Sequence, residues 1–139
     1  MKAIDTNVLA RVLVDDPDDP EAVRQRPAAI AALSERVFVP VTVLLELEWV
    51  LRGFYELSRT EVSRVLNALC GLENVTLEDR EVVLTALERH RDGLDFADAL
   101  HLARSHGCAA FVTLDKKLAR RGAKVGARPR VELLRPRAP

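Results

Sequence analysis

Four acidic residues of this 139-residue chain stand at places where a carboxylate is a poor structural choice. They are Asp5 after a short apolar strand, Glu46 in a leucine-rich stretch, Asp98 near a helix start and Asp115 after another apolar strand. If the fold brings these side chains together, their charges repel and their desolvation is costly unless a hard cation neutralises them. The four acids therefore predict a site for Mg²⁺ or Mn²⁺, cations that prefer oxygen ligands.

Each aspartate also has a structural interpretation when it is taken alone. Asp5 and Asp115 can cap the helices that follow them. Asp95 fits the N-cap of the next helix, which places Asp98 at the third helical position. Asp98 needs a further explanation, because a cap needs one side chain and a second carboxylate three residues later shares the same helical face.

Two glutamates compete for the inward position on the helix predicted from Val41 to Tyr55. Glu46 and Glu48 are about 200° apart on a helix of 3.6 residues per turn, so only one of them can face the carboxyl end of the sheet. We expect the other to face solvent. Leucines flank both residues, so hydrophobic periodicity does not choose between them.

Apolar periodicity and turn residues predict the elements that must position these acids. Strands are expected at residues 2–5, 37–39, 74–77, 109–113 and 131–134. Helices are expected from residue 6 or 7 to 13, and at 21–36, 41–55, 59–71, 79–91, 95–107 and 115–121. Pro27 should kink or divide the second helix. Ser58 and Glu61 form the pattern of a capping box at the start of the fourth.

Strands that alternate with helices indicate an α/β fold with a mostly parallel central sheet of about five strands, flanked by helices. The length fits one compact domain over residues 1–139. In such a fold, functional residues gather beyond the carboxyl ends of the strands. Asp5 and Asp115 both follow strands, as this rule requires.

Composition restricts the class of protein further. The net charge is zero, yet residues 116–139 carry nine Lys or Arg and one Glu, which suits a polyanionic substrate or else a solvated tail. We interpret Cys70 and Cys108 as reduced core residues, which suggests a cytosolic protein. The chain has no signal-peptide pattern and no apolar stretch of about 18 residues, so we expect a soluble cytoplasmic protein without a membrane span.

Four segments of the chain resemble the sequence blocks of a known family. They are Ile4–Leu9, Leu45–Leu51, Asp95–Ala103 and Val112–Leu118. In their order and spacing they resemble the PIN domain, and in particular the VapC-type ribonuclease toxins of bacterial type II toxin–antitoxin pairs. The resemblance extends over nearly the whole chain.

The resemblance implies that Asp5, Glu46, Asp98 and Asp115 are the catalytic, metal-binding acids, and it favours Glu46 over Glu48. Thr6, Asn7 and Thr113 would be polar supports of the site, with Asp95 as the cap of the Asp98 helix. The implied reaction is hydrolysis of RNA phosphodiester bonds with one or two Mg²⁺ or Mn²⁺ ions. The implied partners are RNA, a small cognate antitoxin protein and a second copy of the chain in a homodimer.

Three other functions compete with the toxin interpretation. A PIN nuclease of RNA processing would act without an antitoxin, and a non-catalytic PIN module would only bind nucleic acid or a protein partner. The non-catalytic module predicts the loss of an acid, and all four acids are present. A phosphohydrolase of the haloacid dehalogenase fold also begins with a strand and an Asp, but it requires Asp-x-Asp, where this chain has Asp5-Thr6-Asn7.

Overall fold

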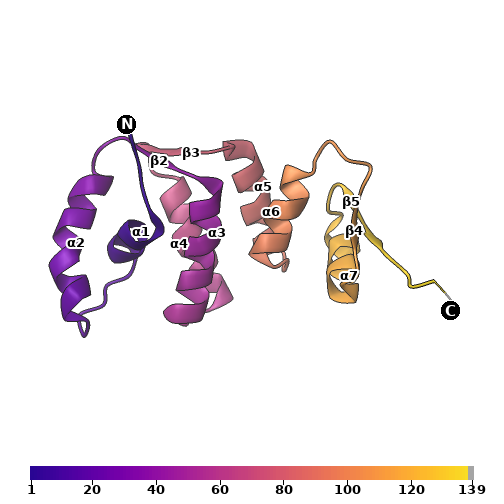
Figure 1. The fold of residues 1–139 in the computed structure, drawn as a ribbon, viewed down its shortest axis with the longest axis horizontal. Helices are drawn as coiled ribbons and strands as arrows, with labels where there is room; N and C mark the ends of the chain where they lie inside the picture. Colours follow the sequence, from indigo (N-terminus) through magenta and orange to yellow (C-terminus); the bar gives the residue numbers. More distant parts are fainter. Residues whose placement is uncertain (138–139) are drawn as a thin grey trace. The chain divides into compact units, whose positions relative to one another are not determined.

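The computed structural model describes residues 1–137, in which helices alternate with strands (Figure 1). The strands are β1 (Lys2–Ala3), β2 (Val37–Val39), β3 (Val75–Leu77), β4 (Ala110–Thr113) and β5 (Arg130–Leu133). The α-helices are α1 (Thr6–Leu13), α2 (Pro20–Leu33), α3 (Val41–Trp49), α4 (Arg59–Cys70), α5 (Arg80–Arg91), α6 (Phe96–Arg104) and α7 (Lys116–Val125). The chain divides into two compact units, Met1–Arg80 and a second that begins at Glu81. The last two residues of the expected domain lie outside the described residues.

A sheet of three parallel strands in the order β1-β2-β3 forms the centre of the first unit. Lys2 lies opposite Val37, and Val37 lies opposite Val75. The central strand β2 buries both Val37 and Val39, as suits β-branched residues in a sheet covered by helices. Parallel neighbours require crossover connections, and these are supplied first by α1 and α2 and then by α3 and α4.

The helix predicted over residues 41–55 has two parts in the structure. The α-helix α3 ends at Trp49, and a π-helical turn, η1 (Val50–Phe54), continues it. The N–H of Tyr55 donates to the carbonyl of Val50, five residues earlier, at 3.1 Å. Leu44, Leu47 and Leu51 remain buried through this change of helix type, so the apolar stripe that predicted the helix is preserved.

Of the kink or division expected at Pro27, helix α2 shows no division. The helix runs from Pro20 to Leu33 without a division, and Pro27 lies inside it. Proline removes the hydrogen bond to the carbonyl four residues earlier, which here belongs to Val23. Val23 is half exposed, and the helix continues through Pro27 without this bond.

The second unit contains a two-stranded parallel sheet in which β4 pairs with β5 and α7 provides the crossover. Gly122 of α7 lies so close to β5 that an added Cβ would stand 2.7 Å from Cγ2 of Val131. Helix α6 reaches β4 through His101, whose ring stacks on Phe111 with centroids 6.3 Å apart. Gly93 ends the turn after α5 with a φ of +115°, a conformation that favours glycine.

The α/β class and the parallel pairing of five strands are confirmed for the described residues, with three strands paired in the first unit and two in the second. Over residues 1–137, no helix has the length and apolar character needed to cross a membrane. The two cysteines are free, but only Cys70 belongs to the core, where burial raises the pKa of its thiol to about 11. The expectation that Cys108 is a core residue is wrong, because it is exposed in the turn after α6.

Candidate active site

Asp5 follows β1 in the first unit and caps helix α1. Its Oδ1 accepts a hydrogen bond from the backbone N–H of Thr6 at 2.8 Å, and its backbone is extended, as an N-cap requires. The residue is exposed. The capping interpretation of Asp5 is therefore correct, and it uses one of two carboxylate oxygens, so it is compatible with a ligand role.

Thr6 connects the start of α1 to the acid on α3. Its hydroxyl donates a hydrogen bond to Oε1 of Glu46, and the Thr6 side chain is almost completely buried. A hydroxyl that donates to a carboxylate fixes the orientation of that carboxylate. Asp5, Thr6 and Glu46 thus form one continuous polar group after β1, which includes two of the four acids named from the sequence.

Asn7 has a different environment from its neighbour Thr6. It is exposed, and it contributes to the lining of an apolar cavity of about 310 Å³ together with residues of α1 and α2 such as Arg11, Gln25 and Ala29. Its predicted support of the acids stays a prediction.

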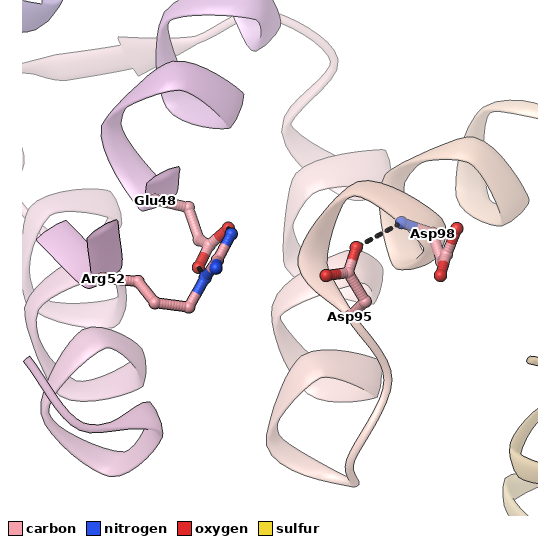
Figure 2. Close-up of polar contacts among 4 residues, drawn as sticks. All are labelled: Glu48, Arg52, Asp95 and Asp98. Carbon is pink, nitrogen blue, oxygen red and sulfur yellow. Dashed lines mark hydrogen bonds and ion pairs between the residues drawn. The ribbon is translucent and has the colours of Figure 1, made fainter. Parts of the chain in front are cut away.

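Glu48 faces the interior of the first unit, and Glu46 is exposed. The carboxylate of Glu48 pairs with Arg52 of η1, with Oε2 of Glu48 2.8 Å from Nε of Arg52 (Figure 2). The expectation that Glu46 is the inward glutamate and Glu48 faces solvent is wrong, because Glu48 is only 3% exposed and its carboxylate is paired with the guanidinium of Arg52. Glu48 is thus engaged in a structural ion pair, which leaves Glu46 as the accessible acid of α3.

Asp95 and Asp98 of the second unit have the relationship that the sequence predicts. Asp95 caps α6, and its Oδ1 accepts a hydrogen bond from the backbone N–H of Asp98 at 3.2 Å (Figure 2). Asp98 stands at the third position of the helix and is half-buried. The cap holds the first turn of α6 and so fixes the place from which the Asp98 side chain extends.

Asp115 occupies the junction between β4 and α7. It caps α7 by accepting hydrogen bonds from the N–H groups of Lys117 and Leu118, at 2.9 and 3.1 Å. Its own N–H donates to the hydroxyl of Thr113 at 3.0 Å. Thr113 therefore contacts the candidate acid directly, in a position suited to the supporting role predicted for it.

Asp95, Asp98 and Asp115 line one cavity of about 230 Å³ in the second unit. The remaining lining residues are Leu94, Lys117, Leu118 and Arg121. Burial is the main cause that raises the pKa of Asp98, and the charges of Asp95 and then Asp115 raise it further, while His101 opposes them. The cavity thus places a half-buried carboxylate in the negative field of two others.

These surroundings fit a divalent cation. Carboxylates that destabilise one another's charge become stable when a cation binds among them, and oxygen atoms are the ligands that Mg²⁺ prefers. The cavity lining contains no His or Cys that would favour a softer metal. Over residues 1–137, neither unit contains three His, Cys, Asp or Glu side chains already grouped around one metal position. Asp5 and Glu46 belong to the first unit, and Asp98 and Asp115 belong to the second.

Sequence reasoning did not identify Lys117 and Arg121 as residues of this cavity. The signal was present in the sequence, because both follow Asp115 and stand four residues apart on one face of α7. In the sequence they belong to the basic segment, residues 116–139, which carries nine Lys or Arg, and charge alone does not single them out.

Comparison with known proteins identifies the family of this fold. The family model of the PIN domain matches residues 2–124, a range that includes every element except β5 and the last residue of α7. No curated protein sequence matches the chain significantly. PIN domains are generally nucleases that use divalent metal ions, which agrees with the carboxylate cavity of the second unit. Because the match covers most of the chain, this protein belongs to the PIN domain family.

Proposed function

We propose that this protein is a metal-dependent endoribonuclease and the toxin of a VapC-type toxin–antitoxin pair. The observation that carries the nuclease proposal is the cavity in which Asp98 meets Asp95 and Asp115, since burial and like charge raise the pKa of Asp98 there. Such surroundings are typical of catalytic sites rather than of solvated surface acids.

Under this proposal, Asp5, Glu46, Asp98 and Asp115 hold Mg²⁺ or Mn²⁺. When bound, the metal supplies an activated water and neutralises the charge that develops on the phosphodiester. Thr6 holds the Glu46 carboxylate through its hydroxyl, and Thr113 holds the backbone of Asp115. The cavity lining contains no Ser, Thr, Cys or His that could serve as a hydroxyl, thiol or imidazole nucleophile, which agrees with attack by water.

The proposed toxin role also specifies the substrate, the protein partner, the oligomeric state and the cell compartment. The substrate is cellular RNA, the controlling partner is a small antitoxin protein, and the working form is a cytoplasmic homodimer of the PIN domain 1–139. The two free cysteines agree with a reducing compartment. The support for the toxin role is the sequence resemblance in the four blocks.

Cleavage of labelled RNA by the purified protein tests the nuclease proposal. We expect cleavage with Mg²⁺ or Mn²⁺ and none with EDTA. Asp98→Asn should abolish it, because the change keeps the shape of the side chain and removes its charge. Asp92→Asn is the matched control, since Asp92 is exposed and does not line the cavity. Cleavage that persists in Asp98→Asn would refute the site, and RNA binding without any cleavage would favour a non-catalytic PIN module.

Growth on induction tests the toxin role separately. Expression of the wild-type protein should arrest growth, and Asp98→Asn should not. Co-expression of the small gene beside it should relieve the arrest. A protein that cleaves RNA in vitro but leaves growth unchanged would instead be an RNA-processing nuclease.

A further inference from the structure

Two basic side chains line the same cavity as the three aspartates of the second unit. Lys117 and Arg121 lie one helical turn apart on α7, so both extend from the face of the helix that borders the cavity. Lys116 and Arg120 precede them by one residue and are absent from the lining. The cavity therefore has an acidic part and a basic part, and of the five basic residues of α7 only Lys117 and Arg121 line it.

Arg121 is held in place by the backbone rather than by the acids. Its Nη1 donates to the carbonyl of Gly93 at 3.3 Å, at the turn that leads into α6. Over residues 1–137, the structure gives no ion pair between Lys117 or Arg121 and the three carboxylates of the cavity. A guanidinium has five N–H donors in a planar fork, and the bond to Gly93 occupies one of them.

This arrangement suits an anion once the acids are neutralised. With a divalent cation among the carboxylates, the two basic side chains leave the cavity with an excess of positive charge. A phosphate group accepts paired hydrogen bonds from an arginine and a point-charge contact from a lysine. If the two cations served only to balance the aspartates, direct ion pairs with them would be expected.

We infer that Lys117 and Arg121 are phosphate-binding residues, which hold a backbone phosphate of single-stranded RNA beside Asp98 and Asp115. The inference rests on the proposed nuclease function and deepens it, because it assigns the substrate contact to two particular residues of the basic segment. Phosphate contacts carry no sequence information, so these residues position the strand and leave the choice of sequence to other contacts.

The test measures binding of a fluorescein-labelled single-stranded RNA to the full chain in EDTA and in Mg²⁺. Every protein carries Glu46→Gln, which should remove cleavage and leaves the three carboxylates of the cavity intact, so that the RNA is not cut. The cavity variant is Lys117→Gln with Arg121→Gln, and the matched control is Lys116→Gln with Arg120→Gln. Both pairs remove two charges from the same helix. Circular dichroism and thermal melting check that each protein is folded.

We expect the cavity variant to raise the Kd in Mg²⁺ by about tenfold more than the control does, because it loses two direct phosphate contacts. The slope of log Kd against log salt concentration should fall by about 1.4 in the cavity variant. The charge-retaining variant Lys117→Arg with Arg121→Lys should bind almost as well as the parent. If the double variant does not fold, the single variants Lys117→Gln and Arg121→Gln are compared with Lys116→Gln and Arg120→Gln.

Equal losses in the cavity and control variants would overturn the inference, because they would reveal only the general charge of α7. A parent that does not bind RNA would overturn it as well. Failure of the nuclease proposal is seen separately, as an absence of cleavage by the wild-type protein.

Discussion

The buried hydroxyl of Thr6 donates a hydrogen bond to the carboxylate of Glu46, 40 residues later in the sequence. This bond links the first residue of α1, directly after the cap Asp5, to the exposed acid of α3. It gives Glu46 a defined orientation, which a carboxylate on the surface otherwise lacks. Two neighbouring residues, Asp5 and Thr6, thus serve the site in different ways, one as a candidate ligand and one as a support.

Removal of the Thr6 hydroxyl should slow RNA cleavage. Thr6→Val keeps the shape of the side chain and deletes the donor, so the Glu46 carboxylate loses its orientation. Loss of a residue that supports a metal ligand costs about 10- to 100-fold in activity or metal affinity. Cleavage rates at increasing Mg²⁺ concentration measure the effect.

Thr6→Ser is the control for this prediction, because serine retains the donor. It should keep most of the activity. If Thr6→Val kept its activity while Thr6→Ser lost it, packing of the γ-methyl group would be responsible and the hydrogen bond would not.

Glu48→Gln should lower stability, whereas Glu46→Gln should mainly affect cleavage. The first change breaks the ion pair of a buried carboxylate with Arg52, and we expect it to reduce the free energy of unfolding by about 1–3 kcal/mol. The second keeps an oxygen that can accept the Thr6 hydrogen bond, so its cost should stay within about 0.5 kcal/mol. Urea unfolding measures the loss in the free energy of unfolding of each variant. A larger loss in Glu46→Gln than in Glu48→Gln would contradict the different roles given to the two glutamates.

Local features of the sequence predicted the parts of the site that depend on neighbouring residues. The cap of Asp95 on the N–H of Asp98 follows from a spacing of three residues, and so does the capping box of Ser58 and Glu61, in which each side chain accepts from the other's backbone N–H. In these cases the chemistry of the side chain and the geometry of a helix start determine the contact.

Features that depend on distant segments were not predictable in the same way. The bond from Thr6 to Glu46 exists because β1 and β2 pair in parallel, so that the helices following them begin near each other. The inward position of Glu48 depends on a partner in the π-helical turn, which periodicity treats as ordinary α-helix. The exposure of Cys108 depends on where α6 ends, and its apolar neighbours in the sequence do not reveal this.

Because the pKa of Asp98 is raised, a neutral residue at this position should stabilise the fold, and the size of this gain should depend on pH. Because the folded protein binds the Asp98 proton more tightly than the unfolded chain does, the charged form destabilises the fold as pH rises through the raised pKa. In EDTA, Asp98→Asn should therefore unfold at a higher temperature than the wild type at pH 7. The difference should vanish below the ordinary pKa of an aspartate, where both proteins are neutral at this position.

The stability test of Asp98→Asn also includes a measurement in Mg²⁺ and a control variant. Mg²⁺ should stabilise the wild type more than Asp98→Asn, since binding to the folded state alone raises its stability. Asp92→Asn, which changes an exposed carboxylate outside the cavity, is the control and should not reproduce the higher melting temperature of Asp98→Asn at pH 7. A higher melting temperature for Asp98→Asn that persists at low pH would show that the effect is unrelated to the charge.

Gly122→Ala should destabilise the second unit by about 1–3 kcal/mol through overpacking. The new Cβ would stand 2.7 Å from Cγ2 of Val131 and 3.4 Å from its Cβ, and a β-branched side chain in a strand has little freedom to move away. Gly107→Ala is the control, because an added Cβ there meets nothing within 4 Å. Chemical unfolding measures the change in the free energy of unfolding for both variants. Since Gly122 follows Arg121 on α7, a displaced helix should also weaken RNA binding in the variant, and normal stability with normal binding would contradict the close packing of α7 on β5.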